Sequence, residues 1–145
     1  MDKNFFSFLS DADRQLLEAR AHHHEFSDGD VILERGNSNA SLHIIKSGNV
    51  SVVTRMLEHA FEIDQLHEND LFGDMSFVDT DSISADIVAK GDVSIDVVSK
   101  EDVEEIISDD PLFYGRFYQA LAQLLSWRLR KMNAQMEGAA FGDSA

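Results

Sequence analysis

A central run of short, β-branched segments separated by turns, from Glu25 to about Ser99, is the feature that most constrains the fold. Clusters of glycine, asparagine and aspartate separate these segments, as in Ser47-Gly48-Asn49 and Lys90-Gly91-Asp92, and they predict turns. Short strands at spacings of roughly 8–12 residues are typical of an all-β sandwich or barrel. The predicted strands contain Val31–Leu33, Leu42–Ile45, Val50–Val53, Phe61–Ile63, Ile87–Ala89 and Val93–Val98.

Helical periodicity flanks this β region on both sides. Residues 5–21 carry an apolar stripe and predict an N-terminal helix. Ser99 and Asp102 predict a capping box that opens a short helix over Glu101–Ile107. Pro111 suits the start of a second, much longer helix, in which apolar residues recur at steps of three and four. The predicted order is helix, about eight strands and two helices.

The net charge of the chain limits the kinds of partner that it can bind. It carries 12 basic and 27 acidic residues, for a net charge of −15. A field of this sign repels phosphate backbones and anionic membranes, so we expect neither nucleic acid nor a membrane surface as a partner. No apolar run approaches the ~18 residues that a membrane span needs, and no signal-peptide pattern opens the chain. We therefore expect a cytoplasmic protein.

No catalytic or metal-binding motif is visible. The chain has no cysteine, which excludes disulfides and thiolate metal sites. It lacks a hydrolytic triad, a Walker loop and a dinucleotide fingerprint, so we predict no catalytic residues and no enzyme. His22-His23-His24 is the one histidine cluster, and adjacent residues at a helix end do not all face one point. We expect these histidines to be solvated and predict no metal site.

The stretch from Leu71 to Ala85 has the layout of an anion-binding turn. An apolar strand end runs into Phe72-Gly73, followed by Asp74, one apolar helical turn, a polar loop and Ser84-Ala85. A helix that begins just after Gly73 would present free backbone N–H groups, which favour an anion. The loop is also acidic, which opposes an anion.

This layout resembles the phosphate-binding cassette of the cyclic nucleotide-binding domain family, which reads roughly Phe-Gly-Glu, short helix, Arg-Ser/Thr-Ala. Other segments resemble the same family in the same order, and the likeness covers residues 5 to about 135. They are Phe26–Ile32, Glu34–Asn37, Leu42–Val50, Asn69–Gly73 and Val98–Asp102. The resemblance implies a single, mainly β domain with flanking helices, built as a jelly-roll β-roll. Its expected parts are an N-terminal helical segment (1–24), the β-roll (25–99), C-terminal helices (100–137) and a tail (138–145).

The resemblance also implies a ligand site, with one marked departure. The family's arginine contacts the cyclic phosphate, and Ile83 stands in its place without a donor. Losing one partner of a buried charge pair costs ~2–5 kcal/mol, so we expect ordinary cyclic nucleotide binding to be lost and predict no cofactor. The family's glutamate binds the ribose, whereas the shorter Asp74 either does so or caps the short helix. The family-equivalent positions are Phe72, Gly73, Asp74, Met75, Ser76, Ile83, Ser84 and Ala85.

Two neighbouring features bear on this site. An arginine could still reach the pocket mouth from Arg35, from Arg55 or from the C-terminal helix, which would rescue binding. His43 takes a position that is usually aromatic in the family, and we interpret it as a packing residue.

The long C-terminal helix predicts a contact surface. Its seam consists of Leu121, Leu125, Leu129, Met132 and Met136. This seam either packs on the β-roll, pairs with a second copy, or binds a helical partner. It runs further than one small roll would bury, and the equivalent helix dimerises in the family, so we favour a homodimer. About ten residues follow it, so we expect no DNA-binding domain of the catabolite-activator type.

Together these features predict a regulatory module that acts through dimerisation or a protein partner. The alternative is a genuine sensor that binds cyclic AMP, cyclic GMP or another small ligand in the same pocket.

Overall fold

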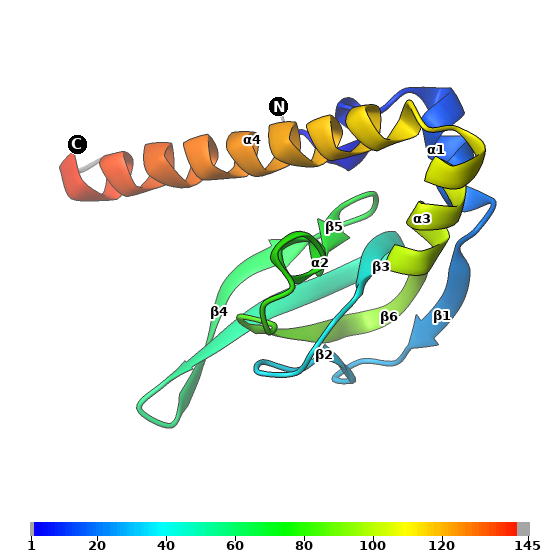
Figure 1. Ribbon diagram of the computed structural model, residues 1–145. Helices are drawn as coiled ribbons and strands as arrows, with labels where there is room; N and C mark the ends of the chain where they lie inside the picture. Colours follow the sequence, from blue (N-terminus) through cyan, green and yellow to red (C-terminus); the bar gives the residue numbers. More distant parts are fainter. Residues whose placement is uncertain (1, 142–145) are drawn as a thin grey trace.

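The computed structural model describes residues 2–141 and is mainly β, with helices gathered along one side of a β-roll (Figure 1). Within these residues, no helix is both long enough and apolar enough to cross a membrane. The elements in chain order are η1 (Phe5–Ser7), α1 (Asp11–Glu18), β1 (His22–Phe26), β2 (Val31–Leu33), β3 (Ser41–Met56), β4 (His59–Leu66), β5 (Leu71–Phe72), α2 (Asp74–Asp79), β6 (Asp86–Ser99), α3 (Lys100–Asp109) and α4 (Phe113–Phe141).

The strands form one antiparallel sheet in the order β1-β6-β3-β4, with β2 paired to β6 and β5 paired to β3. The two long strands, β3 and β6, pair along most of their length. Their register shifts on both sides of Ser47, next to Gly48, whose φ is +88°. A Cβ at Gly48 would overlap the carbonyl oxygen of Asp92, so only glycine fits at this close approach of the two strands.

The predicted strand count needs a correction. We expected about eight strands because Ser47–Asn49 and Lys90–Asp92 look like turns, but residues 2–141 contain six strands. Both glycine clusters lie inside continuous strands, β3 and β6, where positive-φ glycines accommodate irregularities without ending the pairing. In both places the glycine cluster marks a bulge within a strand. The sequence alone does not distinguish such a bulge from a hairpin turn.

The N-terminal helical segment is shorter than predicted. Residues 5–21 divide into η1 and α1, because the Ser10 side chain accepts a hydrogen bond from the Asp13 N–H and starts a new helix. The chain is already in β1 at His22, so the boundary at residue 24 was wrong. At the other end, α4 continues to Phe141, where we expected a tail from residue 138, and residues 142–145 lie outside the described part.

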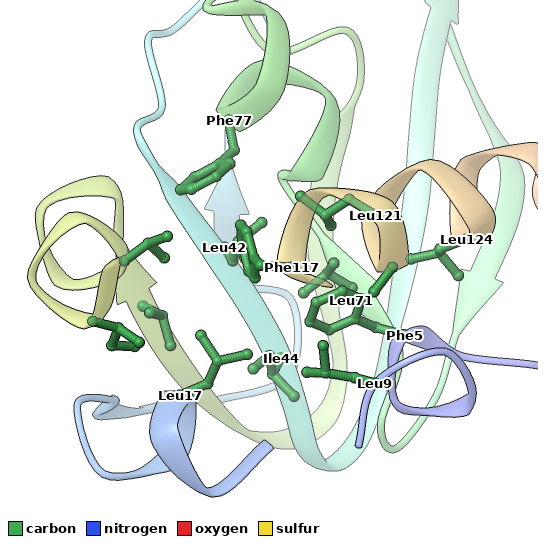
Figure 2. Close-up of a cluster of buried hydrophobic side chains, with 14 of the residues drawn as sticks. Phe5, Leu9, Leu17, Leu42, Ile44, Leu71, Phe77, Phe117, Leu121 and Leu124 are labelled. Carbon is green, nitrogen blue, oxygen red and sulfur yellow. The ribbon is translucent and has the colours of Figure 1, made fainter. Parts of the chain in front are cut away.

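Two apolar clusters form the core. One lies inside the β-roll and includes Ile45, Val50, Phe72 and Ile95. The other joins the helices to the sheet, and its central side chains point toward one another from η1, α1, α2, β3 and α4 (Figure 2). Its labelled members are Phe5, Leu9, Leu17, Leu42, Ile44, Leu71, Phe77, Phe117, Leu121 and Leu124.

An ion pair between a buried aspartate and an exposed arginine fixes the start of α4. The carboxylate of Asp13, in the first turn of α1, accepts two hydrogen bonds from Arg116, at 2.9 and 3.0 Å. The same guanidinium donates to Asp110 at 2.8 Å. Because the fork of an arginine matches a carboxylate in only a few orientations, these bonds set the direction in which α4 leaves α3.

Candidate functional site

The cassette-like turn is built as the sequence predicted. β5 ends at Phe72, Gly73 takes the left-handed conformation (φ +75°), and α2 begins at Asp74. One face of α2 is buried through Asp74, Ser76 and Phe77, while Met75 faces solvent. The Phe77 ring meets Phe117 of α4 edge-on at 6.0 Å, so the short helix packs directly on the C-terminal helix (Figure 2).

Asn39 holds this turn in place, and the sequence analysis missed it. Its side-chain amide donates to the carbonyl of Gly73 at 3.0 Å and to the carbonyl of Ser41 at 2.8 Å. The same nitrogen lies 3.1 Å from the hydroxyl of Ser76. It also lies 2.8 Å from where a Gly73 Cβ would be. Asn39 sits in a polar loop with no distinguishing pattern, so only the fold reveals its role.

A cation approaches the cassette from the C-terminal helix. Arg128 of α4 donates from Nη1 to Oδ2 of Asp74 at 2.8 Å and from Nη2 to the carbonyl oxygen of Leu71 at 2.6 Å. Asp74 is only 4% exposed, and the Arg128 side chain is 29% exposed. The sequence left three possible sources of an arginine near the pocket, namely Arg35, Arg55 and the C-terminal helix. The helix supplies one next to the cassette.

This pair changes the interpretation of Asp74. Within residues 2–141, the carboxylate accepts a hydrogen bond from Arg128, and no side-chain hydrogen bond caps α2. Asp74 lies in the first turn of α2, where a negative charge favours the helix end, so its capping role stays a prediction. The acid that aligns with the family's ribose contact is instead neutralised by a side chain 54 positions later in the chain. Whether it also contacts a ribose stays a prediction.

The second half of the predicted site follows α2. Ile83 is 8% exposed, and its backbone bonds to the Glu34–Asn37 turn through Asn37 O and Gly36 N. Ala85 is buried beside it, whereas Ser84 is exposed. The position where the family has its arginine therefore holds an apolar side chain that packs against protein and offers no hydrogen-bond donor.

His43 lies behind the turn, as a packing residue. Its ring stacks on Phe72 with centroids 4.9 Å apart, and its Nδ1 has no hydrogen-bond partner within the described chain. Burial lowers the pKa of His43 to about 4, so the ring is neutral at ordinary pH. The prediction that His43 packs is confirmed.

The three consecutive histidines do not lie where the sequence placed them. They occupy β1 rather than a helix end, and all three are exposed. His23 bonds to Asp96 at 3.2 Å, which raises the pKa of His23. Within residues 2–141, no group of three or more His, Asp or Glu side chains is arranged to hold a metal ion.

The seam predicted on α4 divides into two parts. Leu121 is buried in the domain's own core, so it is not available to a partner. Leu125 is half-buried, and Leu129, Met132 and Met136 are 59%, 56% and 63% exposed. The exposed part lies where α4 continues past its buried segment, and Figure 1 shows this end of the helix extending beyond the sheet.

The comparisons with known proteins agree with this geometry. The family profile described as the cyclic nucleotide-binding domain matches residues 23–110, which is more than half of the chain. The chain belongs to the cyclic nucleotide-binding domain family. The matched region covers the β-roll, the whole cassette and α3. Curated proteins give no significant match to the sequence.

Solved cyclic nucleotide-binding domains and related regulators share the fold. A cyclic nucleotide-binding domain from Methylobacillus flagellatus superposes with a TM-score of 0.81 at 20% identity, covering 90% of this chain and 74% of the other. The catabolite activator protein of Thermus thermophilus gives 0.77 at 26% identity, covering 94% and 63%. The N-terminal domain of a Streptomyces coelicolor transcriptional regulator gives 0.74 at 21% identity, covering 91% and 90%. The jelly-roll prediction is confirmed, and the family points to a regulatory rather than a catalytic module.

Proposed function

We propose that this cyclic nucleotide-binding domain is a regulatory module whose cassette is closed by its own C-terminal helix. In this proposal it acts through pairing of α4 or through a protein partner, in the cytoplasm, and not by catalysis or by binding nucleic acid or a membrane. The observation that carries the proposal is the Arg128–Asp74 pair in a cassette whose phosphate position holds Ile83.

The chemistry of the cassette supports the loss of the ordinary ligand. A cyclic phosphate bound at α2 would find the apolar side chain of Ile83 where the family has a guanidinium. A ribose hydroxyl would have to compete with Arg128 for the carboxylate of Asp74. Both would donate to an ionised carboxylate, but only the guanidinium carries a positive charge of its own, so the neutral hydroxyl is the weaker competitor.

Titration calorimetry with cyclic AMP and cyclic GMP tests this part. We expect no binding tighter than a dissociation constant of about 1 mM for the wild-type chain, because the missing charge pair costs ~2–5 kcal/mol. Ile83→Arg should restore measurable binding, whereas Ile83→Met, which adds no donor, should not. A dissociation constant below about 10 µM for the wild type would contradict the proposal.

One observation favours the alternative, a genuine ligand sensor. A guanidinium has five N–H donors, and Arg128 uses two of them on Asp74 and Leu71. The remaining N–H donors of Arg128 are available to an anionic ligand, whereas Ile83 has no donor. If the wild type binds a cyclic nucleotide and Arg128→Gln abolishes that binding while Arg130→Gln does not, the sensor reading replaces the first proposal.

The pattern on α4 supports self-association. The steps between Tyr118, Ala122, Leu125, Leu129, Met132 and Met136 alternate between four and three, which is the heptad spacing of a coiled coil. Ala122 takes the place in this heptad seam that we had given to Leu121. Contiguous exposed apolar side chains of this kind mark a contact surface. The proposal is a parallel pair of α4 helices around this heptad seam.

Sedimentation velocity tests the pairing. We expect a dimer for the wild type and a monomer for Leu129→Asp, which puts a charge into the heptad seam. Ala134→Asp is the matched control, because residue 134 is exposed and lies about 140° around the helix from residue 129. A wild-type monomer, or a dimer that survives Leu129→Asp, would count against self-association through α4.

A further inference from the structure

A groove runs along α4 next to the heptad seam, with which it shares Ala122. It is shallow and open to solvent, and it lies between the N-terminal segment, which contributes Lys3 and Phe8, and successive turns of α4. Its volume is about 360 Å³. The helix residues that matter for its shape are Ala122, Ser126, Trp127 and Arg130. Figure 1 shows the N-terminal helical turn beside α4.

The shape of this groove suits a helix. Its α4 residues run from Gln119 to Arg130, which is about three turns or ~16 Å of helix length. The small side chains of Ala122 and Ser126 line it, and they allow a backbone to approach closely. The rings of Phe8 and Trp127 supply apolar surface, as in grooves that receive the apolar face of an amphipathic helix.

The charges of the groove are unusual for this protein. Lys3 and Arg130 line it, and within residues 2–141 neither forms an ion pair with a carboxylate. Most of the chain's other cations are already paired with acids, namely Arg14, Arg20, Lys46, Lys90, Arg116, Arg128 and Lys131. The Lys3 ammonium lies over the Phe8 ring, 5.6 Å from its centroid. In a chain with 27 acidic and 12 basic residues, two cations in one apolar groove that pair with no carboxylate of residues 2–141 are a local exception to the overall charge.

We propose that this groove docks an acidic amphipathic helix of a protein partner. Its apolar face would lie on Phe8 and Trp127, and its carboxylates would meet Lys3 and Arg130. Interactions between exposed charges are screened beyond about 8 Å at physiological salt, so the two local cations outweigh the distant acidic surface. The inference goes beyond the proposed function, because it names a partner and a second contact surface. It does not depend on the state of the cassette, but the groove shares Ala122 with the surface proposed for pairing of α4.

The charges argue against a second copy of α4 as the occupant. Between residues 113 and 138 this helix carries Arg116, Arg128, Arg130 and Lys131 but only one acid, Glu137. Two such helices packed through the groove would place like charges together, which destabilises a helix pair. The α4 of a second copy therefore does not fit the groove, and the occupant must be a helix of the opposite charge.

The experiment uses the full chain and a pair of designed peptides. Both are 18-residue, terminally blocked helices with leucines at positions i, i+3, i+4 and i+7, and they differ only in carrying Glu or Lys at the flanking positions. Trp127 is the chain's only tryptophan and lines the groove, so its fluorescence reports occupancy directly. We expect the acidic peptide to shift this fluorescence and to bind at least 10-fold more tightly than the basic peptide.

Charge reversals locate the site. Arg130→Glu should weaken binding of the acidic peptide about 10-fold, while Arg55→Glu should leave it unchanged. Arg55 is the matched control, because it is also exposed and forms no ion pair within residues 2–141, but it lies at the far end of β3. Circular dichroism of both variants verifies that they remain folded.

Three results would overturn the proposal. The first is that the acidic peptide does not bind, or binds no better than the basic one. The second is that Arg55→Glu weakens binding as much as Arg130→Glu does. The third is that Arg130→Glu changes the sedimentation coefficient of the chain alone, because the groove would then be a contact between copies. None of these results bears on the nucleotide titration. The third is distinguished from pairing through the heptad seam by whether Leu129→Asp also changes the sedimentation coefficient.

Discussion

Removing Arg128 should destabilise the domain, because it leaves the buried carboxylate of Asp74 without its cation. Asp74 is 4% exposed, and Arg128 approaches it at 2.8 Å. Breaking a buried ion pair by deleting one partner costs ~3–5 kcal/mol when the remaining charge is left uncompensated. The Arg128 side chain is 29% exposed, so water can partly replace it, and we place the cost of Arg128→Met at the low end, about 3 kcal/mol. Asp74→Asn should cost less, about 1–1.5 kcal/mol, because the freed guanidinium can turn toward solvent.

Urea unfolding followed by circular dichroism measures these free energies, and a double-mutant cycle isolates the pair. The double variant should lose about 1.5–2 kcal/mol less than the sum of the two single variants. Arg130→Met is the matched control on the same helix and should change stability by less than about 0.5 kcal/mol, since Arg130 pairs with no carboxylate in residues 2–141. Additive single and double variants would refute the reasoning and leave α4 held by apolar packing alone.

Three other predictions concern the interior and the turns. The folded chain keeps His43 neutral, with a pKa of about 4, whereas the unfolded chain takes up a proton near pH 6.5. The free energy of unfolding should therefore fall by about 2.5 kcal/mol more in the wild type than in His43→Leu between pH 7.5 and 4.5; equal losses would contradict this. In urea unfolding, Gly73→Ala should lower the free energy of unfolding by about 2–4 kcal/mol and Gly36→Ala by only about 1 kcal/mol. Both glycines have positive φ, but only Gly73 has atoms close to the added Cβ. Equal losses would show that these close contacts contribute nothing. Leu57 and Glu58 join β3 to β4 with φ of 52° and 70°, so Leu57→Asn with Glu58→Gly should stabilise the domain by about 1–2 kcal/mol, and an unchanged melting temperature would show that the turn is not strained.

The local parts of the fold could be predicted from the sequence because they depend on neighbouring residues. Ser99 and Asp102 form the predicted capping box at the start of α3. Gly73 ends a strand and starts α2 at the predicted position, since only glycine takes a left-handed conformation there without strain. The strands were also found, but their number was not, because a bulge and a turn use the same residues.

The environment of the candidate site could be predicted only in part. The isoleucine at position 83 can be read directly from the sequence, and it argues against a phosphate ligand without any knowledge of the fold. Asn39 supports Gly73 from 34 positions away, and nothing in the intervening sequence indicates that contact. Leu121 is buried and Leu129 is exposed because α4 leaves the β-roll between them. Helical periodicity in the sequence does not indicate where that point lies.

The sequence by itself determined the family, the order of strands and helices, and the absence of a cation in the second half of the cassette. Those properties follow from residue patterns within one or two turns or strands. Only the tertiary structure decided that Arg128 binds Asp74 and that Lys3 and Arg130 share a groove. These are contacts between distant segments, and they exist because Asp13, Phe77 and Phe117 fix the path of α4 across the domain.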